Sequence, residues 1–125
     1  MAKFPGMFIA LTHWFTLVPN SDYFEEGGDH ANEMETSVIM HYFPQLVGPL
    51  EDAGDGSSKD WKLKGLKEKI AWSPRKWDEV SADTGIGDPR KATPEKGQRF
   101  VDEVTSRIGS FIAELSECNL DDMYA

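Results

Sequence analysis

The sequence is poor in residues that indicate several common classes of protein. It contains one cysteine, Cys118, so an internal disulfide and a cysteine-rich zinc site are both excluded. Its 13 Lys and Arg are outnumbered by 22 Asp and Glu, which gives a net charge of −9. Nucleic acids and anionic membrane surfaces attract clustered basic groups, so neither is an expected partner. These absences favour a soluble protein in a reducing cytoplasm.

Long apolar runs are also missing. A membrane-spanning helix needs about 20 consecutive apolar residues, whereas the longest run here, from Met7 to Val18, is interrupted by Thr12 and His13. Lys3 is the only basic residue before this run and no clear small-residue cleavage site follows it, so we expect no signal peptide. The hydrophobic content of 39% is ordinary for a globular chain, and residues 1–125 are therefore predicted to form one domain.

Three stretches are candidates for strands. Phe8–Phe15 is almost continuously apolar and predicts a strand buried on both faces, as in a parallel sheet. Such a strand needs neighbours on both sides, and the chain offers few. Trp61–Lys64 alternates like an edge strand, and Ile70–Trp77 is predicted to form short strands or irregular chain.

Two stretches have the apolar spacing of helices. The first runs from about Ala31 to Phe43, and an acidic, Gly- and Ser-rich loop follows at about 51–60. The second, at about 94–116, has Thr93 as its predicted N-cap and Pro94 at its first position. Together with the expected strands, these helices favour an α/β fold.

Titratable groups are concentrated where the first helix begins. Gly27 and Gly28 are followed by Asp29 and His30, and Glu33 and Glu35 come directly after. Such crowding is typical of a functional site. A structural explanation stays open, in which Asp29 is the helix N-cap and the two glutamates are early-helix acids that suit the helix dipole.

The segment His30-Ala31-Asn32-Glu33-Met34-Glu35-Thr36-Ser37 resembles the His-Ala-Gly-x-x-Glu-Thr-Ser motif of the creatininase (creatinine amidohydrolase) family. Residues 85–97, Gly-Ile-Gly-Asp-Pro-Arg-Lys-Ala-Thr-Pro-Glu-Lys-Gly, resemble that family's Gly-x-Pro-x-x-Ala-Thr-x-Glu-x-Gly lead into its last helix. The resemblance covers roughly residues 8–115. Asn32 replaces the usual glycine of the first motif, and asparagine is the next best residue for a positive φ.

The resemblance implies a three-layer α/β/α fold, of which this chain would be the C-terminal half. It also implies a pair of divalent metal ions, Zn²⁺ or Mn²⁺, held by segments that read like Thr-Glu-x-His-Gly and Asn-Gly-His-Gly-Gly-Asn. Neither segment occurs in this chain. The pair His30-x-x-Glu33 is a weak ligand pattern, and two ligands do not make a site. We therefore expect the metal ligands to lie outside the chain and predict no metal-binding residue within it.

By the same resemblance, His30 is the catalytic residue that passes a proton to the leaving nitrogen, and imidazole is the side chain suited to proton transfer near neutral pH. Glu35 would orient it. Because Glu35 lies five positions later, this pairing requires His30 to be in a non-helical entry turn. Substrate-binding roles are assigned to Trp14, which lies at the end of the first predicted strand, and to Gly27, Asp29 and Glu33.

The remaining aromatic and imidazole side chains have less specific interpretations. His13 is expected in the core, and His41, late in its helix, has a structural role. The side chains of Trp61, Trp72 and Trp77 cover a pocket or serve a subunit interface. Members of the family are commonly homo-oligomers, often hexamers, which favours an interface for at least one of the three.

These observations support two main hypotheses. The first is an amidohydrolase part that acts on a cyclic or small amide. The second is a non-catalytic truncated or fragment chain that folds and oligomerises without activity. A small acidic binding module is a third reading, which rests only on the charge and the tryptophans.

Overall fold

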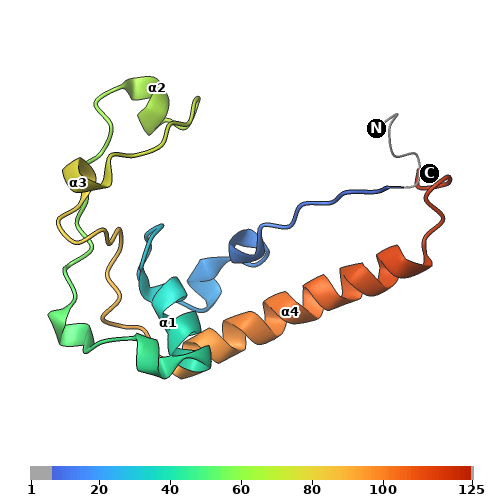
Figure 1. Ribbon diagram of the computed structural model, residues 1–125, viewed down its shortest axis with the longest axis horizontal. Helices are drawn as coiled ribbons and strands as arrows, with labels where there is room; N and C mark the ends of the chain where they lie inside the picture. The colour runs from blue at the N-terminus through green and yellow to red at the C-terminus, as the bar shows by residue number, and fades with distance from the viewer. Residues whose placement is uncertain (1–6, 125) are drawn as a thin grey trace.

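The computed structural model describes residues 7–124, and within them the secondary structure is helical. In chain order, the α-helices are α1 (Glu33–Tyr42), α2 (Lys64–Lys67), α3 (Trp77–Val80) and α4 (Pro94–Glu117). Short 3-10 helices are formed by Trp14–Thr16, Asn20–Asp22, Pro44–Leu46 and Leu50–Asp52. Figure 1 shows α1 packed across the first turns of α4, with the chain between them extending away as a long arch that carries α2 and α3.

The longest element, α4, is the helix that the sequence predicted at about 94–116. The Thr93 side chain accepts a hydrogen bond from the Lys96 backbone N–H at 3.2 Å, and Pro94 occupies the first turn, where no N–H is needed. The first half of α4 buries Phe100, Val101 and Val104. Its second half extends beyond the core, and Ile112 there is 58% exposed.

Close approach of α1 and α4 depends on a residue without a side chain. A Cβ atom placed on Gly97 would lie 2.0 Å from the carbonyl oxygen of Ser37, so only glycine fits at this crossing. The Ser37 hydroxyl also accepts a hydrogen bond from the Thr93 backbone N–H at 3.2 Å. These contacts fix the start of α4 against the middle of α1.

The hydrophobic core lies between these two helices and the chain that precedes α1. Phe100 is fully buried at its centre, with ring centroids of Phe24 and Tyr23 at 5.3 and 5.5 Å. The other members of the buried cluster are Val18, Met34, Val101 and Val104. This small core holds α1, and the turn that leads into it, in place.

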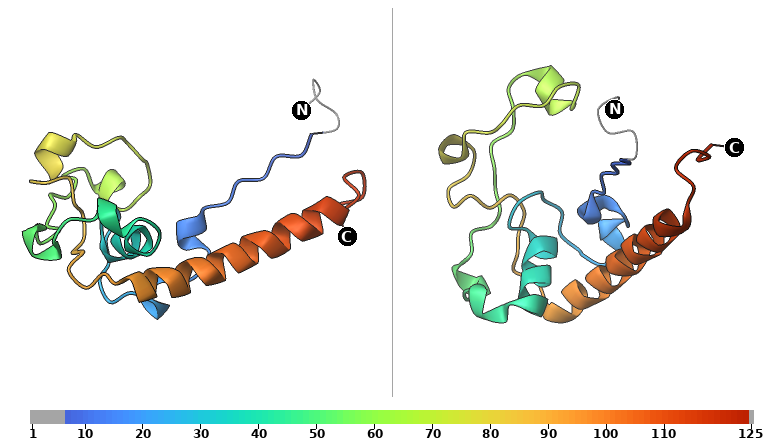
Figure 2. Two further views of the ribbon diagram at one scale, coloured as in Figure 1. Left: turned by 60° about the horizontal axis from the view of Figure 1, so that its bottom comes forward. Right: turned by 45° about the vertical axis from the view of Figure 1, so that its right-hand side comes forward.

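The strands predicted at Phe8–Phe15 and Trp61–Lys64 are wrong for the described residues. Residues 8–13 run as extended chain without ladder partners, and Trp14–Thr16 forms a 3-10 turn (Figure 2). Ile9 and Leu11 are each 81% exposed, and among residues 7–124 no bridge pairs this segment with another. Leu63 is the N-cap of α2 rather than part of an edge strand. Residues 70–76 are irregular, which is one of the two alternatives predicted for Ile70–Trp77. The described chain therefore lacks the sheet of a three-layer α/β/α fold.

The arch between α1 and α4 is held at its base by backbone contacts. Lys59 donates its N–H to the Val80 carbonyl at 2.8 Å, and Gly87 donates to the Gly56 carbonyl at 2.9 Å. Most of the loop predicted at about 51–60 is irregular, apart from the end of the 3-10 turn Leu50–Asp52. Across residues 7–124, no helix has the length and apolar character needed to cross a bilayer.

Candidate functional site

The two sequence motifs lie against each other in the structure. The Ile86 carbonyl accepts hydrogen bonds from the N–H groups of Asp29, at 2.9 Å, and His30, at 3.3 Å. Ile86 donates its own N–H to the His30 carbonyl at 2.8 Å, which completes an antiparallel bridge. Each segment of this contact contains a glycine with positive φ, Gly28 at +137° and Gly87 at +110°, and a Cβ atom on either glycine would clash with the backbone of the other segment. The backbone of His30 is therefore fixed by a segment 56 residues away.

The turn after His30 differs from the predicted one. Asn32, rather than Asp29, is the N-cap of α1, and its side-chain oxygen accepts the Glu35 N–H at 3.0 Å. The positive φ falls on Ala31, at 49°, while Asn32 has a φ of −81°. The asparagine that replaces the family glycine thus caps the helix and does not supply left-handed backbone.

His30 and Glu35 come together as predicted from an entry turn. His30 precedes the N-cap, and its Nδ1 lies 3.9 Å from Oε2 of Glu35. The same oxygen accepts a hydrogen bond from the Ala31 N–H at 2.6 Å, so the carboxylate is held in place by the turn. Both side chains are accessible, with 48% of His30 and 37% of Glu35 exposed. This arrangement presents an imidazole to solvent beside a fixed carboxylate.

A broad, mainly apolar groove of about 770 Å³ begins at this pair. Its lining includes Trp14, His30, Glu35, Val38, Ile39 and Leu50. The Trp14 indole is 38% exposed and packs edge-on against Phe100 of the core, with ring centroids 6.1 Å apart. Of the four residues predicted to bind substrate, Trp14 is the one that lines the groove.

Glu33 has a structural position. Its side chain is fully buried, and its Oε2 accepts the N–H groups of Glu25 and Glu26 at 2.9 and 2.7 Å. Its Oε1 accepts from Lys96 Nζ at 2.6 Å, and this hydrogen bond raises the pKa of the Lys96 ammonium. Both carboxylate oxygens are thus occupied by the protein, which is incompatible with the substrate-binding role predicted for Glu33 in this conformation.

Asp29 and Gly27 also lie away from the groove. The Asp29 carboxylate forms a two-pronged ion pair with the Arg75 guanidinium, in which Oδ1 accepts from Nη1 at 3.0 Å and Oδ2 from Nη2. The Gly27 carbonyl oxygen faces Gly87, where a Cβ atom would lie 2.4 Å from it. Asp29 is therefore held by the arch, and Gly27 contributes to the backbone contact between the motifs.

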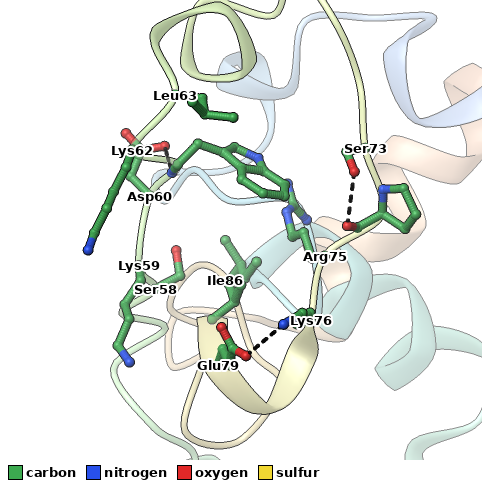
Figure 3. Close-up of a pocket in the computed structure, with 13 residues that line it drawn as sticks. Ser58, Lys59, Asp60, Lys62, Leu63, Ser73, Arg75, Lys76, Glu79 and Ile86 are labelled. Carbon is green, nitrogen blue, oxygen red and sulfur yellow. Dashed lines mark hydrogen bonds and ion pairs between the residues drawn. The ribbon is translucent and has the colours of Figure 1, made fainter.

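A second cavity, of about 760 Å³, is lined by both limbs of the arch and by Ile86. Figure 3 shows Arg75 and Ile86 pointing into it, together with Lys76, which is paired with Glu79. Sequence reasoning did not identify Arg75, because nothing in residues 70–77 indicates a partner 46 residues earlier. The sequence indicates Trp77 only as a pocket or interface residue, whereas in the structure the centroid of its ring lies 4.8 Å from that of His30.

The described residues do not fit a metal centre. Residues 7–124 contain no group of three or more His, Cys, Asp or Glu side chains arranged to hold an ion. Near His30, the carboxylates of Asp29 and Glu33 are occupied by Arg75 and Lys96. What the site does offer is an accessible imidazole, a neighbouring carboxylate and an apolar groove, which suits proton transfer to a bound ligand.

Comparison with known proteins is consistent with this geometry. The family model for creatininase, described as creatinine amidohydrolase, matches residues 3–112. The chain belongs to the creatininase family. No curated protein matches the sequence.

A solved structure is similar over most of the chain. It is the crystal structure of a protein from Bacteroides fragilis named "Putative creatinine amidohydrolase", which is 44% identical and superposes with a TM-score of 0.86. The match covers 95% of this chain and 47% of that one. This chain thus has the fold of the matching part of that protein and spans about half of its length.

Proposed function

We propose that this chain supplies the proton-transfer side of a creatininase-type amidohydrolase site, which cleaves the C–N bond of a cyclic or small amide. One observation carries the proposal. His30 and Glu35, the two catalytic residues predicted from the family motif, lie 3.9 Å apart and both line an open groove. Family membership supports the reaction class.

In this proposal His30 is the general acid that protonates the leaving nitrogen of the amide. Its exposed imidazole can reach a ligand in the groove. Glu35 is a positioning residue, because its carboxylate is anchored by the Ala31 N–H and lies beside Nδ1. Trp14 would contribute an apolar wall for the substrate.

The two segments that would hold the metal ions of the family do not occur in this sequence. We propose that a pair of divalent ions, Zn²⁺ or Mn²⁺, is held by ligands outside this chain, and that the chain corresponds to the C-terminal half of a three-layer α/β/α enzyme. Coverage of 47% of the Bacteroides fragilis protein supports this view. We further propose a cytoplasmic homo-oligomer, for which the single cysteine and the family resemblance are the support.

The test is to join the chain to the N-terminal half of a related creatininase and to measure hydrolysis of a panel of small cyclic amides. Substitution His30→Ala should lower kcat by about 10²- to 10⁴-fold, the usual contribution of a general acid. His41→Ala, which removes a histidine late in α1, is the matched control and should retain activity. Equal activity of the His30→Ala and unsubstituted proteins would exclude His30 as the proton donor.

Metal content tests the proposed source of the ligands. Elemental analysis of the purified chain should show no stoichiometric divalent ion, whereas the joined protein should retain metal. A stoichiometric load on the chain alone would show that its own residues complete a metal centre.

A second candidate is a non-catalytic chain that folds by self-association, and exposed apolar residues favour it. In the extended segment 8–13, Ile9 and Leu11 are each 81% exposed, with their backbone groups available to a second copy. Substitution Leu11→Lys should then shift the sedimenting species to monomer. Leu63→Lys, at a 67% exposed position on the arch, is the matched control. A chain that sediments as a monomer before any substitution would rule out this candidate.

A further inference from the structure

We propose that Trp77 and Arg75, two residues of the arch outside both family motifs, are positioning residues for the His30 imidazole. The inference rests on the proposed function for its meaning in catalysis, since it concerns how the proton donor of that site is oriented. It begins from the contact between Trp77 and His30, whose ring centroids are 4.8 Å apart with planes inclined by 47°.

Trp77 acts on the histidine rather than on a ligand. His30 and Glu35 line the apolar groove, and Trp77 is not part of that lining. The indole therefore restrains the imidazole while Glu35 lies 3.9 Å from its Nδ1. An exposed histidine with only one neighbour would sample several rotamers, whereas contacts with both groups limit the directions in which its ring can point.

Arg75 contacts both Asp29, which precedes the histidine, and Trp77, which packs on it. Its guanidinium pairs with both carboxylate oxygens of Asp29, the residue directly before His30. The same guanidinium lies over the Trp77 ring, with Cζ 5.7 Å from the centroid. Planar guanidinium groups can form a two-pronged ion pair and stack on an aromatic ring at once, which an ammonium group cannot do.

The arch is thereby joined to the turn that carries His30. Trp77 starts α3, whose last residue, Val80, accepts the Lys59 N–H at 2.8 Å. The backbone of His30 is bonded to Ile86, the preceding side chain to Arg75, and its own ring contacts Trp77. Three residues, Arg75, Trp77 and Ile86, thus set the orientation of one imidazole.

The experiment uses the whole chain with ¹³C-labelled histidine and records the imidazole resonances by NMR. The Trp77 ring current should displace the His30 signals, and Trp77→Ala should return them toward those of a free histidine. Trp77→Phe keeps a ring at the position and should restore part of the displacement. Trp72→Ala removes an 84% exposed indole from the same segment and is the matched control.

His13 and His41 serve as internal references in the same spectra, because their nearest aromatic partners are Phe15 and Tyr42 rather than Trp77. Their signals should stay unchanged in every variant that folds. Arg75→Lys should also move the His30 signals toward those of a free histidine, since an ammonium cannot hold Asp29 and Trp77 together. Lys76→Gln, which removes the ion pair between the N-cap of α3 and Glu79, should leave them unchanged.

Unchanged His30 resonances in Trp77→Ala and Trp77→Phe would overturn the inference. The same holds if Trp72→Ala displaces them equally. Neither result depends on turnover, so a chain without amidohydrolase activity leaves this inference standing. Conversely, if His30→Ala abolishes activity but the His30 resonances do not change in the Trp77 variants, the positioning role is refuted and the proposed function stands.

Discussion

The carboxylate of Glu33 accepts a hydrogen bond from Lys96 Nζ at 2.6 Å and so joins the first residue of α1 to the first turn of α4. The remaining oxygen accepts two backbone N–H groups from residues 25 and 26. A single buried side chain therefore connects three segments of the chain.

Replacing this carboxylate should destabilise the fold. Glu33→Ala leaves the two N–H groups and the Lys96 ammonium without their acceptor, which we expect to cost about 2–4 kcal/mol of unfolding free energy. Urea denaturation measures the change. Glu114→Gln, at an exposed position of α4, should stay within about 0.5 kcal/mol of the parent protein. A Glu33→Ala chain as stable as that control would show that the contact does not hold the segments together.

The crossing of α1 and α4 predicts opposite effects at two glycines of one helix. Gly97→Ala places a methyl group 2.0 Å from the Ser37 carbonyl oxygen and should destabilise the protein by about 3 kcal/mol, because the helices must separate. Gly109→Ala meets nothing within 4 Å and should stabilise α4 by up to about 1 kcal/mol, because alanine favours helix. Thermal unfolding of the two variants tests this difference in sign. A Gly97→Ala protein with an unchanged melting temperature would refute the close crossing.

The N-cap at Asn32 gives a third prediction. Asn32→Ala removes the acceptor for the Glu35 N–H and should cost about 1 kcal/mol, whereas Asn32→Asp should retain the cap. Asn32→Gly, which introduces the usual family residue, should cost only a few tenths of a kcal/mol. Circular dichroism melting curves rank the three variants. Equal melting temperatures for Asn32→Ala and Asn32→Asp would show that the side chain does not cap α1.

Stability should fall at acidic pH because the Asp88 carboxylate of the second motif is stabilised by Arg90 in the folded protein. Hydrogen bonds from the Arg90 guanidinium lower the pKa of the Asp88 carboxyl to about 2, and the ammonium groups of Lys96 and Lys91 lower that of Glu25. A carboxyl whose pKa is lower in the folded state stabilises it above the unfolded pKa, and this contribution disappears as the pH falls through the folded value. The loss for Asp88 should therefore extend from about pH 4 to about pH 2.

Arg90→Gln tests this assignment. The Asp88 carboxyl should then titrate closer to an ordinary aspartate, as followed by NMR of its side-chain carbon, and the acid unfolding curve should become less steep. Lys64→Gln removes a cation of α2 that pairs with Glu68 and serves as the control. If Asp88 titrates identically in both variants, another group is responsible for its lowered pKa.

The helices α1 and α4 and the first motif could be predicted because their signals are local, whereas the short helices α2 and α3 were not predicted. Thr93 and Pro94 are typical residues for the start of a helix and predict where α4 begins. The five-residue spacing between His30 and Glu35 predicts that His30 precedes α1. The strand at Phe8–Phe15 could not be judged locally, since an apolar run forms a strand only where another segment supplies hydrogen-bond partners.

The contacts that set the site were beyond sequence reasoning for a related reason. Glu33 and Lys96 are 63 residues apart, and Arg75 and Asp29 are 46 apart. Charge alone does not select these pairs in a chain with 22 acidic groups. Burial decides the Glu33–Lys96 pair, because Glu33 is enclosed where α1 crosses α4. The Arg75–Asp29 pair is partly exposed and depends instead on the path of the arch.

The bridge between His30 and Ile86 also divides the chain into parts with different tolerance to change in length. The two limbs of the arch are joined below α2 by the hydrogen bonds of Lys59 with Val80 and of Gly87 with Gly56, so the tip around α2 can be lengthened, shortened or cleaved without moving the limbs. The portion from Arg75 to Trp77 does not share this freedom, because it touches Asp29 and His30. Within one loop, the α2 tip can thus accept a foreign sequence, whereas an insertion between Arg75 and Trp77 would move the side chains that contact Asp29 and His30.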